Sequence, residues 1–232
     1  MDYDFAAGEI LLLDKPLDWT SFDVVKKVRN TIRVKKVGHA GTLDPLATGL
    51  LILCTGKFTK RIDEIQGQEK EYTGTIRLGE ITPSYDRETE VTETRDSSHL
   101  TRESIEAAAS AFVGTIEQVP PIYSAVMVDG KRAYDLARKG KSAELKARTI
   151  TIKAFDITAM EGAEVSFRVI CTKGTYIRSL AHDLGQQLGC GAHLSSLVRT
   201  RIGDYKLTDA LTIEDIQEIR RKQIEAANGS NP

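Results

Sequence analysis

The chain has 232 residues, of which 41% are hydrophobic and 28% are charged, and its formal net charge is −1. These values exclude a disordered chain, and a chain of this length buries roughly 70–75% of its unfolded surface without disulfides. Its three cysteines are widely spaced and lack CxxC or Cys–His pairing, which argues against structural zinc and favours a reducing compartment.

The first predicted element is a short strand in GEILLLDKP that ends at Pro16. Its apolar run is too short for a signal peptide or a membrane span, so we expect a cytoplasmic protein. Thr20 and Asp23 then have the spacing of a capping box, which predicts the start of a helix. The expected buried face of this helix holds Phe22, Val25, Val28 and Ile32.

A glycine-rich loop over residues 38–45 leads into the continuous apolar run LLILCTG, which predicts a strand buried on both faces. The run EKEYTGTIRLGE follows and alternates like a strand, with Tyr72 and Ile76 on one side. Residues 80–98 are polar and lack periodicity, so we expect them to form a loop.

The middle of the chain predicts a helix and several strands. The helix opens at Leu100 and Thr101 and has an apolar residue at every third or fourth position. Residues 120–134 predict a strand, an Asp-Gly turn and a basic helical piece. Residues 148–172 are typical of two strands around a glycine turn.

The last third of the chain predicts a helix after Gly174, a strand near 196–207 and a final helix from Thr212. No linker, repeat or low-complexity tract divides the sequence. We therefore expect one mixed α/β domain over residues 8–226 and a disordered tail over residues 227–232.

The net charge alone predicts no nucleic-acid partner, but the charges are segregated along the chain. Residues 26–36 contain six Lys or Arg and no acid, and residues 131–148 contain seven against two acids. Residues 86–96 contain five acids against two arginines. Such segregation is expected if one face binds a polyanion, although solvated helix faces produce the same pattern.

Asp44 is the first candidate for chemistry. Pro45 disfavours a helical conformation at Asp44, and the flanking glycines permit tight turns and the close approach of a ligand. A carboxylate on such a loop can act as a nucleophile, a general base or an electrostatic stabiliser. The alternative is an ordinary turn residue whose side chain caps a local N–H group.

Four other residues are candidates for binding. His39 has no metal-ligand spacing to other histidines, and it either contacts RNA or is an exposed loop residue. Tyr72 and Tyr176 either pack in the core or line a site. Arg178 lies in the first turn of a predicted helix, where the helix dipole disfavours a cation. This placement suggests a specific anionic partner, and a buried Asp44 would suit.

Motifs from Gly8 to Asp215 resemble, in order, those of the TruB family, the tRNA pseudouridine-55 synthases. They are LLLDKP, TSFDVV, GHAGTLDPLATGLL, KEYTGTIRLG, PPIYSAVMVDGKRAYDLAR, KGTYIRSLAHDLG and GCGAHLSSLVRT. The combination of GTLDPLATG with KGTYIR is highly specific. The resemblance implies the pseudouridine synthase fold, a mixed α/β (α+β) architecture. Its long, mostly antiparallel sheet has flanking helices and a central RNA-binding cleft.

The resemblance also implies the reaction. A uridine in the T-loop of tRNA is flipped out, its C1′–N1 bond is broken, the base turns, and C1′ is rejoined to C5. Carried over by position, Asp44 is the catalytic aspartate and Arg178 is its charged partner. Tyr72 stacks on the target base, and His39 helps to extrude and hold the nucleotide.

Other residues are assigned by the same resemblance. The remaining substrate contacts are Tyr176, Leu197, Asp86 and Lys15, the last of which is structural or faces a phosphate. A basic insertion near 125–148 corresponds to a loop that folds over the T arm. The expected contacts to the RNA backbone are Lys35, Lys36, Lys131, Arg132, Arg138 and Lys139.

Two positions depart from the family pattern. Pro83 replaces an earlier aspartate in TPSYD, and Asp18 stands where glycine is usual. The chain has no room for the C-terminal PUA-type domain of many members, so we expect a short form. We expect it to act on the T arm of tRNA as a monomer, without a cofactor, a metal, a protein partner or a membrane.

Three alternatives remain open at this point. The first is a non-catalytic module that binds or folds tRNA on the same scaffold. The second is a carboxylate-based hydrolase of nucleosides or sugars, which needs a second acid that the motif around Asp44 lacks. The third is a guide-RNA-dependent relative, which shares these motifs but has further domains and partners.

Overall fold

The computed structural model describes residues 3–128, 130–140 and 145–229. The chain divides into two compact units. Unit 1 is formed by Met1–Lys70 with Val198–Pro232, and unit 2 by Glu71–Leu197. The single domain expected over residues 8–226 stays a prediction.

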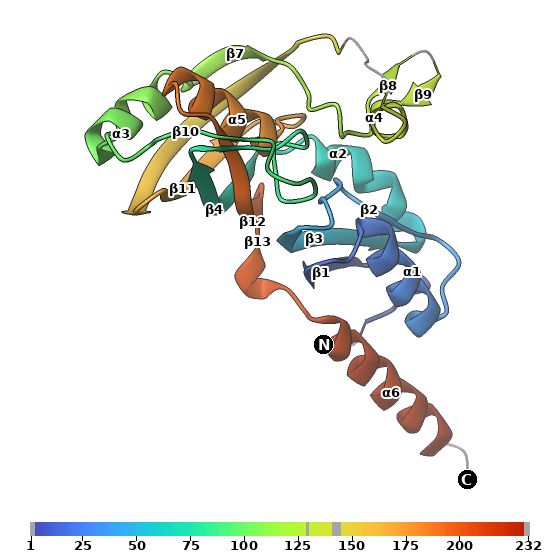
Figure 1. The fold of residues 1–232 in the computed structure, drawn as a ribbon. Helices are drawn as coiled ribbons and strands as arrows, with labels where there is room; N and C mark the ends of the chain where they lie inside the picture. The colour runs from blue at the N-terminus through green and yellow to red at the C-terminus, as the bar shows by residue number, and fades with distance from the viewer. Residues whose placement is uncertain (1–2, 129, 141–144, 230–232) are drawn as a thin grey trace. The chain divides into compact units, whose positions relative to one another are not determined.

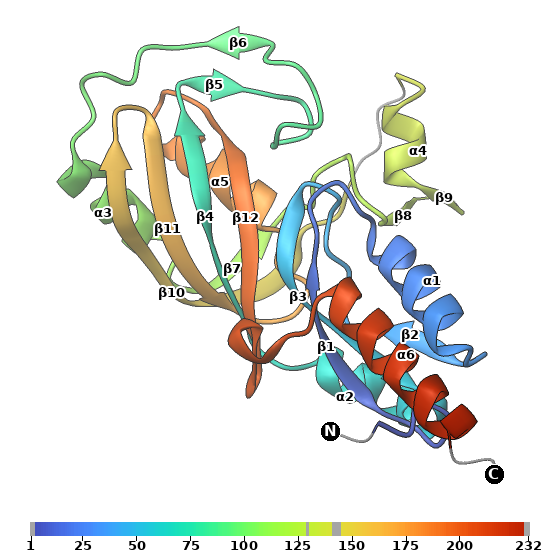
Figure 2. The ribbon, with the colours of Figure 1, turned by 90° about the horizontal axis from the view of Figure 1, so that it is seen from below.

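Unit 1 contains the strands β1 (Ile10–Lys15), β2 (Val37–His39) and β3 (Ala47–Thr55). Its other elements are α1 (Ser21–Ile32), η1 (Gly56–Arg61), α2 (Ile62–Gln66), β13 (Tyr205–Lys206), η2 (Leu207–Asp209) and α6 (Ile213–Gly229). Strands β1 and β2 both pair with β3 in the antiparallel sense. Helices α1 and α6 lie side by side beside these strands (Figure 2).

Strand β3 is buried on both faces, which confirms the prediction for its apolar run. Leu51 and Leu53 belong to a core cluster with residues of α1 and α6. Leu50 and Ile52 belong to a second cluster, which includes Ile65 of α2. Because side chains alternate along a strand, one apolar run supplies both hydrophobic layers.

Helix α1 begins with the predicted capping box. The Thr20 hydroxyl accepts from the Asp23 N–H at 3.0 Å, and the Asp23 carboxylate accepts from the Thr20 N–H at 3.0 Å. The prediction that Phe22 is buried is wrong, because its side chain is 63% exposed. Phe22 lies roughly 100° around the helix from the centre of the buried stripe. That stripe holds Ser21, Val24, Val25, Val28 and Ile32.

The outer edge of β1 is covered by the segment that leads into α6. The Leu211 N–H donates to the Leu12 carbonyl at 2.8 Å, and the Asp14 N–H donates to the Leu211 carbonyl at 2.9 Å. Helix α6 then continues to Gly229, so residues 227–229 are helical and the prediction of a disordered tail is wrong there. Residues 230–232 lie outside the described residues.

Unit 2 is built mainly from long strands (Figure 1). The strands of its sheet are β4 (Lys70–Leu78), β7 (Gly114–Gln118), β10 (Arg148–Glu161), β11 (Glu164–Cys171) and β12 (Ala192–Ile202). Its helices are α3 (Arg102–Ser110), α4 (Ala133–Ala137) and α5 (Ile177–Gln187). Two small hairpins complete it, β5 (Glu80–Ile81) with β6 (Glu93–Thr94) and β8 (Met127–Val128) with β9 (Lys131–Arg132).

Among the described residues, the main sheet has nine strands, in the order β1-β3-β12-β4-β11-β10-β7, with β2 paired to β3 and β13 paired to β12. Strand β12 begins in unit 2 and ends in unit 1, so it contributes to both. The pairings β10–β11 and β10–β7 are antiparallel, as are those of β1 and β2 with β3. The expected mixed α/β fold with a large, mostly antiparallel sheet is confirmed.

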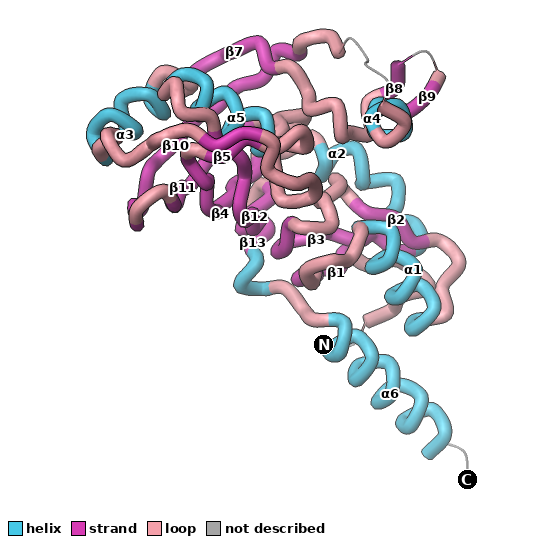
Figure 3. Tube along the Cα trace, viewed as in Figure 1, coloured by secondary structure: helices cyan, strands magenta, loops and turns pink. Residues whose placement is uncertain are grey.

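Two details of unit 2 differ from the sequence predictions. Residues 80–98 contain the β5–β6 pair within an otherwise looped segment (Figure 3). Next to this pair, the Thr92 N–H donates to the Ile81 carbonyl at 2.9 Å and the Thr92 hydroxyl donates to the same carbonyl at 3.2 Å. These bonds involve no apolar side chain, so apolar alternation does not predict the pair. Strand β12 begins at Ala192 rather than near 196, and a left-handed Gly203 separates it from β13.

Candidate active site

The loop that carries Asp44 lies in unit 1, between β2 and β3. Helix α1 anchors the loop at Leu43, directly before Asp44. The Ser21 hydroxyl accepts from the Leu43 N–H at 2.9 Å and donates to the Leu43 carbonyl at 3.1 Å. The Asp18 N–H donates to the Pro45 carbonyl at 2.9 Å. Asp44 is half-buried between these two anchors. The loop is therefore fixed by contacts with the segments before and at the start of α1.

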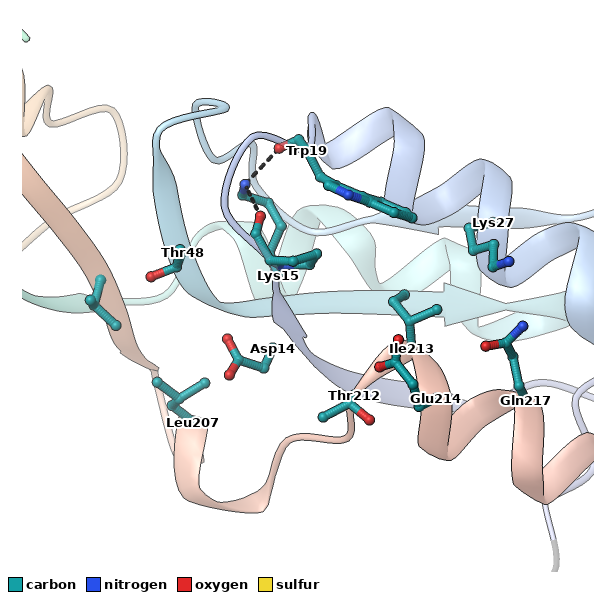
Figure 4. Close-up of a pocket in the computed structure, with 12 residues that line it drawn as sticks. Asp14, Lys15, Trp19, Lys27, Thr48, Leu207, Thr212, Ile213, Glu214 and Gln217 are labelled. Carbon is teal, nitrogen blue, oxygen red and sulfur yellow. Dashed lines mark hydrogen bonds between the residues drawn. The ribbon is translucent and has the colours of Figure 1, made fainter. Parts of the chain in front are cut away.

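Lys15 supplies another anchor from the end of β1. The residue is fully buried, and its Nζ donates to the carbonyls of Trp19 at 2.6 Å, Pro16 at 2.9 Å and Pro45 at 3.2 Å. Figure 4 shows its ammonium turned toward the backbone. Burial lowers the pKa of Lys15 to about 8, opposed chiefly by the charge of Asp44. Of the two roles expected for Lys15, this geometry supports the structural one.

Arg199 was not recognised in the sequence as part of this loop's surroundings. It lies on β12 in unit 1 and is 1% exposed. Its guanidinium donates to the carbonyls of Leu50 at 2.8 Å, Gly41 at 3.1 Å and Thr42 at 3.3 Å. Basic residues are common throughout the chain, so composition gave no reason to single this one out.

His39 lies at the end of β2, directly before this loop, and it is half-buried. Burial lowers the pKa of its imidazole, so the neutral ring is favoured near neutral pH. A neutral, half-buried ring is suited to packing against a base or a sugar. The structure thus places His39 and Asp44 in the same unit, on one short segment.

A pocket of about 580 Å³ lies next to Lys15 in unit 1 (Figure 4). It is lined by Asp14, Trp19, Lys27, Thr48 and the first turn of α6, among others. Asp44 is not among the described residues that line it. This pocket is therefore distinct from the loop on which the candidate catalytic carboxylate lies.

Arg178 and Asp86 form a buried pair in unit 2. The distance from Arg178 Nε to Asp86 Oδ2 is 3.6 Å, and the side chains are 5% and 8% exposed. At that distance the two groups attract as ions rather than through a well-formed hydrogen bond. Arg178 Nη1 also donates to the carbonyls of Tyr123 at 2.9 Å and Ser84 at 3.3 Å.

Asp86 is held by a tight turn over the sequence TPSYD. Its backbone carbonyl accepts from the hydroxyl of Thr82 at 2.6 Å, and its Oδ1 accepts from the Glu88 N–H at 2.9 Å. Tyr85 has a left-handed φ of 63° and stacks on His182 of α5, with ring centroids 3.8 Å apart. Since Arg178 and His182 lie one helical turn apart, α5 contacts this turn at two points.

Tyr176, the N-cap residue of α5, is fixed by a side chain that the sequence did not indicate. The buried Gln118 accepts from the Tyr176 N–H at 2.8 Å and donates to the Tyr176 carbonyl at 3.1 Å. Tyr72 of β4 and Leu197 of β12 are buried, with 7% and 9% exposure. Tyr72, Tyr176, Leu197, Asp86 and Arg178 thus all lie in unit 2.

The residues expected to contact the RNA backbone are exposed where the structure describes their side chains. Lys35 and Lys36 follow α1 in unit 1, and Lys131, Arg138 and Lys139 lie around α4 in unit 2. Arg132 belongs to β9, but its side chain lies outside the described residues, as do residues 129 and 141–144 of the expected insertion. Exposed basic side chains that do not pack in the hydrophobic core are suited to contacts with phosphates.

Two features are absent from the part of the chain that the structure describes. Within residues 3–128, 130–140 and 145–229, no three His, Cys, Asp or Glu side chains gather as a metal site. Across the same ranges, no helix has the length and apolar character that crossing a membrane requires.

Residues 29–177 match the model of the TruB family pseudouridylate synthase N-terminal domain, and residues 178–228 match that of the tRNA pseudouridylate synthase B C-terminal domain. The chain belongs to the TruB family. The resemblance seen in its motifs is therefore confirmed, and the boundary between the two matches falls inside KGTYIR.

Relatives of known name agree with this membership. The chain is 54% identical over 221 residues to a tRNA pseudouridine synthase B of Phocaeicola vulgatus, covering 93% of this chain and 94% of that one. It is 53% identical over 239 residues to a tRNA pseudouridine synthase B of Bacteroides thetaiotaomicron, covering 98% and 100%. The chain is accordingly a tRNA pseudouridine synthase, which is an isomerase.

Solved structures support the fold. One similar chain comes from an H/ACA RNP bound to a substrate RNA containing 2′-deoxyuridine, with a TM-score of 0.73 and 28% identity. It is matched over 96% of this chain and 56% of that one. Another comes from the archaeal box H/ACA sRNP Nop10–Cbf5 complex, with a TM-score of 0.72, 27% identity and coverage of 96% and 57%. This chain therefore spans little more than half the length of these two.

Proposed function

We propose that this isomerase acts on uridine 55 in the T-loop of tRNA and that Asp44 is its catalytic carboxylate. The observation that carries the proposal is the anchoring of the Asp44 loop to its surroundings by Ser21, Asp18 and Lys15. A carboxylate on a preorganised loop keeps its geometry while charge develops on the substrate. The T-loop uridine is inferred from the ordered family motifs.

The chemistry is a redox-neutral rearrangement that needs no external group. The C1′–N1 bond breaks and the base takes the electron pair, which leaves positive character at C1′. Asp44 stabilises or captures that centre, or adds to the base. After the base turns, C5 bonds to C1′ and loses its proton, and N1 gains one. Reactant and product are therefore isomers.

Residues of both units have roles in this proposal. Arg178 supplies a positive charge, Tyr72 stacks on the uracil, and Tyr176 and Leu197 form apolar walls around it. His39 holds the extruded nucleotide, whose unstacking requires a few kcal/mol that pocket contacts offset. Asp86 orients Arg178. The exposed lysines and arginines identified above contact phosphates and position the RNA without reading its sequence.

We also propose that the protein works as a monomer in the cytoplasm, without a protein partner or a guide RNA. The curated relatives match over nearly their whole length and are named for tRNA. Light scattering of the purified chain, alone and with tRNA, would report a single copy per tRNA.

Tritium release from tRNA labelled at C5 of uridine tests the proposal. Wild-type protein should release tritium from position 55, and a tRNA with cytidine at that position should release none. Asp44→Asn should reduce release to background, whereas Asp63→Asn, an exposed aspartate of α2, should leave it unchanged. Wild-type protein that binds tRNA without release would support a tRNA-folding module instead. Undiminished release by Asp44→Asn would exclude Asp44 as the catalytic group.

A further inference from the structure

Arg199 binds the backbone at positions before and after Asp44 in the sequence. Two of its carbonyl partners, Gly41 and Thr42, precede Asp44, and the third, Leu50, follows it in β3. The hydrogen bonds described for Arg199 all go to backbone carbonyls. The planar guanidinium carries its donors in a fixed fork, so it sets the relative positions of the oxygens that it binds.

The backbone around Arg199 is shaped to permit this contact. Gly49 has a φ of 95°. A Cβ atom at this position would lie 2.5 Å from the backbone carbonyl oxygen of Arg199 and 2.9 Å from the backbone nitrogen of Arg199. Gly41 has a φ of 99°, which turns its carbonyl in a way that side-chain-bearing residues rarely adopt. Both glycines are part of GHAGTLDPLATG, so the motif encodes close approach of the loop to β12.

A buried guanidinium is an unfavourable choice if its role is only to fill space. Removing a charge from water is energetically unfavourable, and an apolar side chain of similar volume often stabilises a fold better. Arginine also keeps its proton at any physiological pH, so the charge persists in the interior. Burial is the main cause of the lowered pKa values of Lys15 and His39, and the nearby charge of Arg199 lowers both further. Its charge therefore reaches the groups that surround Asp44.

We propose that Arg199 is a positioning residue for the isomerisation: by fixing the carbonyls of Gly41, Thr42 and Leu50, it holds the Asp44 carboxylate in the orientation that the reaction needs. The proposal rests on the function proposed for Asp44. Arg199 itself touches no reacting atom. Lys15 binds the carbonyl of Pro45, the residue directly after Asp44, so two buried basic side chains constrain one short loop.

The test compares Arg199→Met and Arg199→Lys with Ile65→Val, a conservative core substitution in unit 1. Each folded variant is measured for single-turnover tritium release at saturating tRNA, for the Kd of tRNA, and for amide hydrogen exchange across residues 38–50. Arg199→Met should lower the single-turnover rate about 100-fold, since misplacement by an ångström has effects of that size. The Kd should stay within threefold, and exchange should rise selectively in the loop.

Arg199→Lys keeps the charge and loses the fork, so its rate should fall less than that of Arg199→Met. A folded Arg199→Met protein with the wild-type rate would overturn the proposal. So would exchange that rises equally throughout unit 1, as expected for a purely structural residue and for Ile65→Val. If Arg199→Met does not fold, a folded Arg199→Lys protein with unchanged rate and exchange overturns it instead. Wild-type protein that releases no tritium would refute the proposed function, and loop exchange would still decide whether Arg199 orders the loop.

Discussion

Arg178 and Asp86 lie 3.6 Å apart, Nε to Oδ2, in the interior of unit 2, although they are far apart in the sequence. Each is held by further bonds, Arg178 to the carbonyls of Tyr123 and Ser84, and Asp86 to the Glu88 N–H. Arg178 lies in the first turn of α5, and Asp86 follows Tyr85, whose φ is left-handed. The pair therefore joins α5 to the TPSYD turn, and its loss has measurable consequences.

Asp86→Ala should destabilise the protein by about 3 kcal/mol, because removal of one partner leaves the other charge buried. Asp86→Asn should be less damaging, because the amide oxygen can still accept from the Glu88 N–H. Urea unfolding measures both changes, with the exposed Glu90→Ala as the matched control. Equal stability of Asp86→Ala and Glu90→Ala would show that the pair contributes nothing to the fold.

Lys15 should make stability depend on alkaline pH. Its pKa is about 8 in the folded protein against 10.5 in an exposed lysine, so the unfolded chain binds more protons between these values. The contribution of Lys15 to the free energy of unfolding is therefore least favourable below about pH 8. It increases by on the order of 3 kcal/mol as the pH rises from there toward 10.5, the pKa of lysine in the unfolded chain. Urea unfolding of Lys15→Met between pH 7 and pH 10 should lack this rise, whereas the exposed Lys60→Met should keep it.

Asp183 should produce a pH dependence of the opposite sign. Burial raises its pKa from 3.8 to about 6, so the folded protein holds a proton that the unfolded chain has lost. The contribution of Asp183 to the free energy of unfolding is therefore present near pH 4 and is lost as the pH rises through 6. Its magnitude is on the order of 3 kcal/mol. Asp183→Asn should therefore gain stability over wild type between these pH values. Parallel unfolding curves for the two proteins, like those expected for the exposed Asp204→Asn, would contradict this.

The exposed lysines should contribute to tRNA affinity through salt-dependent contacts. Lys35→Ala and Lys139→Ala should each weaken binding and reduce the slope of log K against log salt by about 1, the value for one phosphate contact. Filter binding between 50 and 200 mM salt measures the slope. Lys222→Ala, an exposed lysine of α6, serves as the control and should leave the slope unchanged. An equal slope in all three variants would remove Lys35 and Lys139 from the RNA interface.

Local patterns predicted most of the regular structure. The capping box at Thr20, the double-sided burial of β3 and the β10–β11 pair each depend on residues close together in sequence, and each was found. The predicted burial of Phe22 was wrong. An amphipathic pattern identifies the centre of the buried stripe of a helix, but it does not decide which residues at the edge of that stripe are buried. The β5–β6 pair was missed because its residues are polar or isolated and show no alternation of apolar side chains.

The surroundings of the site were harder to predict, for a physical reason. Gln118 reaches Tyr176, and Arg199 reaches Gly41, through hydrogen bonds that join distant parts of the chain. No periodicity records such a contact, since it depends on the tertiary fold alone. Family motifs indicated Asp44 and Arg178 by position, but they could not indicate which carbonyl oxygens hold the neighbouring loop in place.

The covering of β1 by Leu211 has a consequence for how the chain behaves in a crowded cell. A bare edge strand offers unpaired N–H and C=O groups on which another polypeptide can add, and this is a common route to aggregation. Because the Leu12 carbonyl and the Asp14 N–H already bond to Leu211 of the same chain, another polypeptide cannot pair with β1 at these two groups. The segment before α6 thus shields this part of the edge in the folded protein as well as joining two elements.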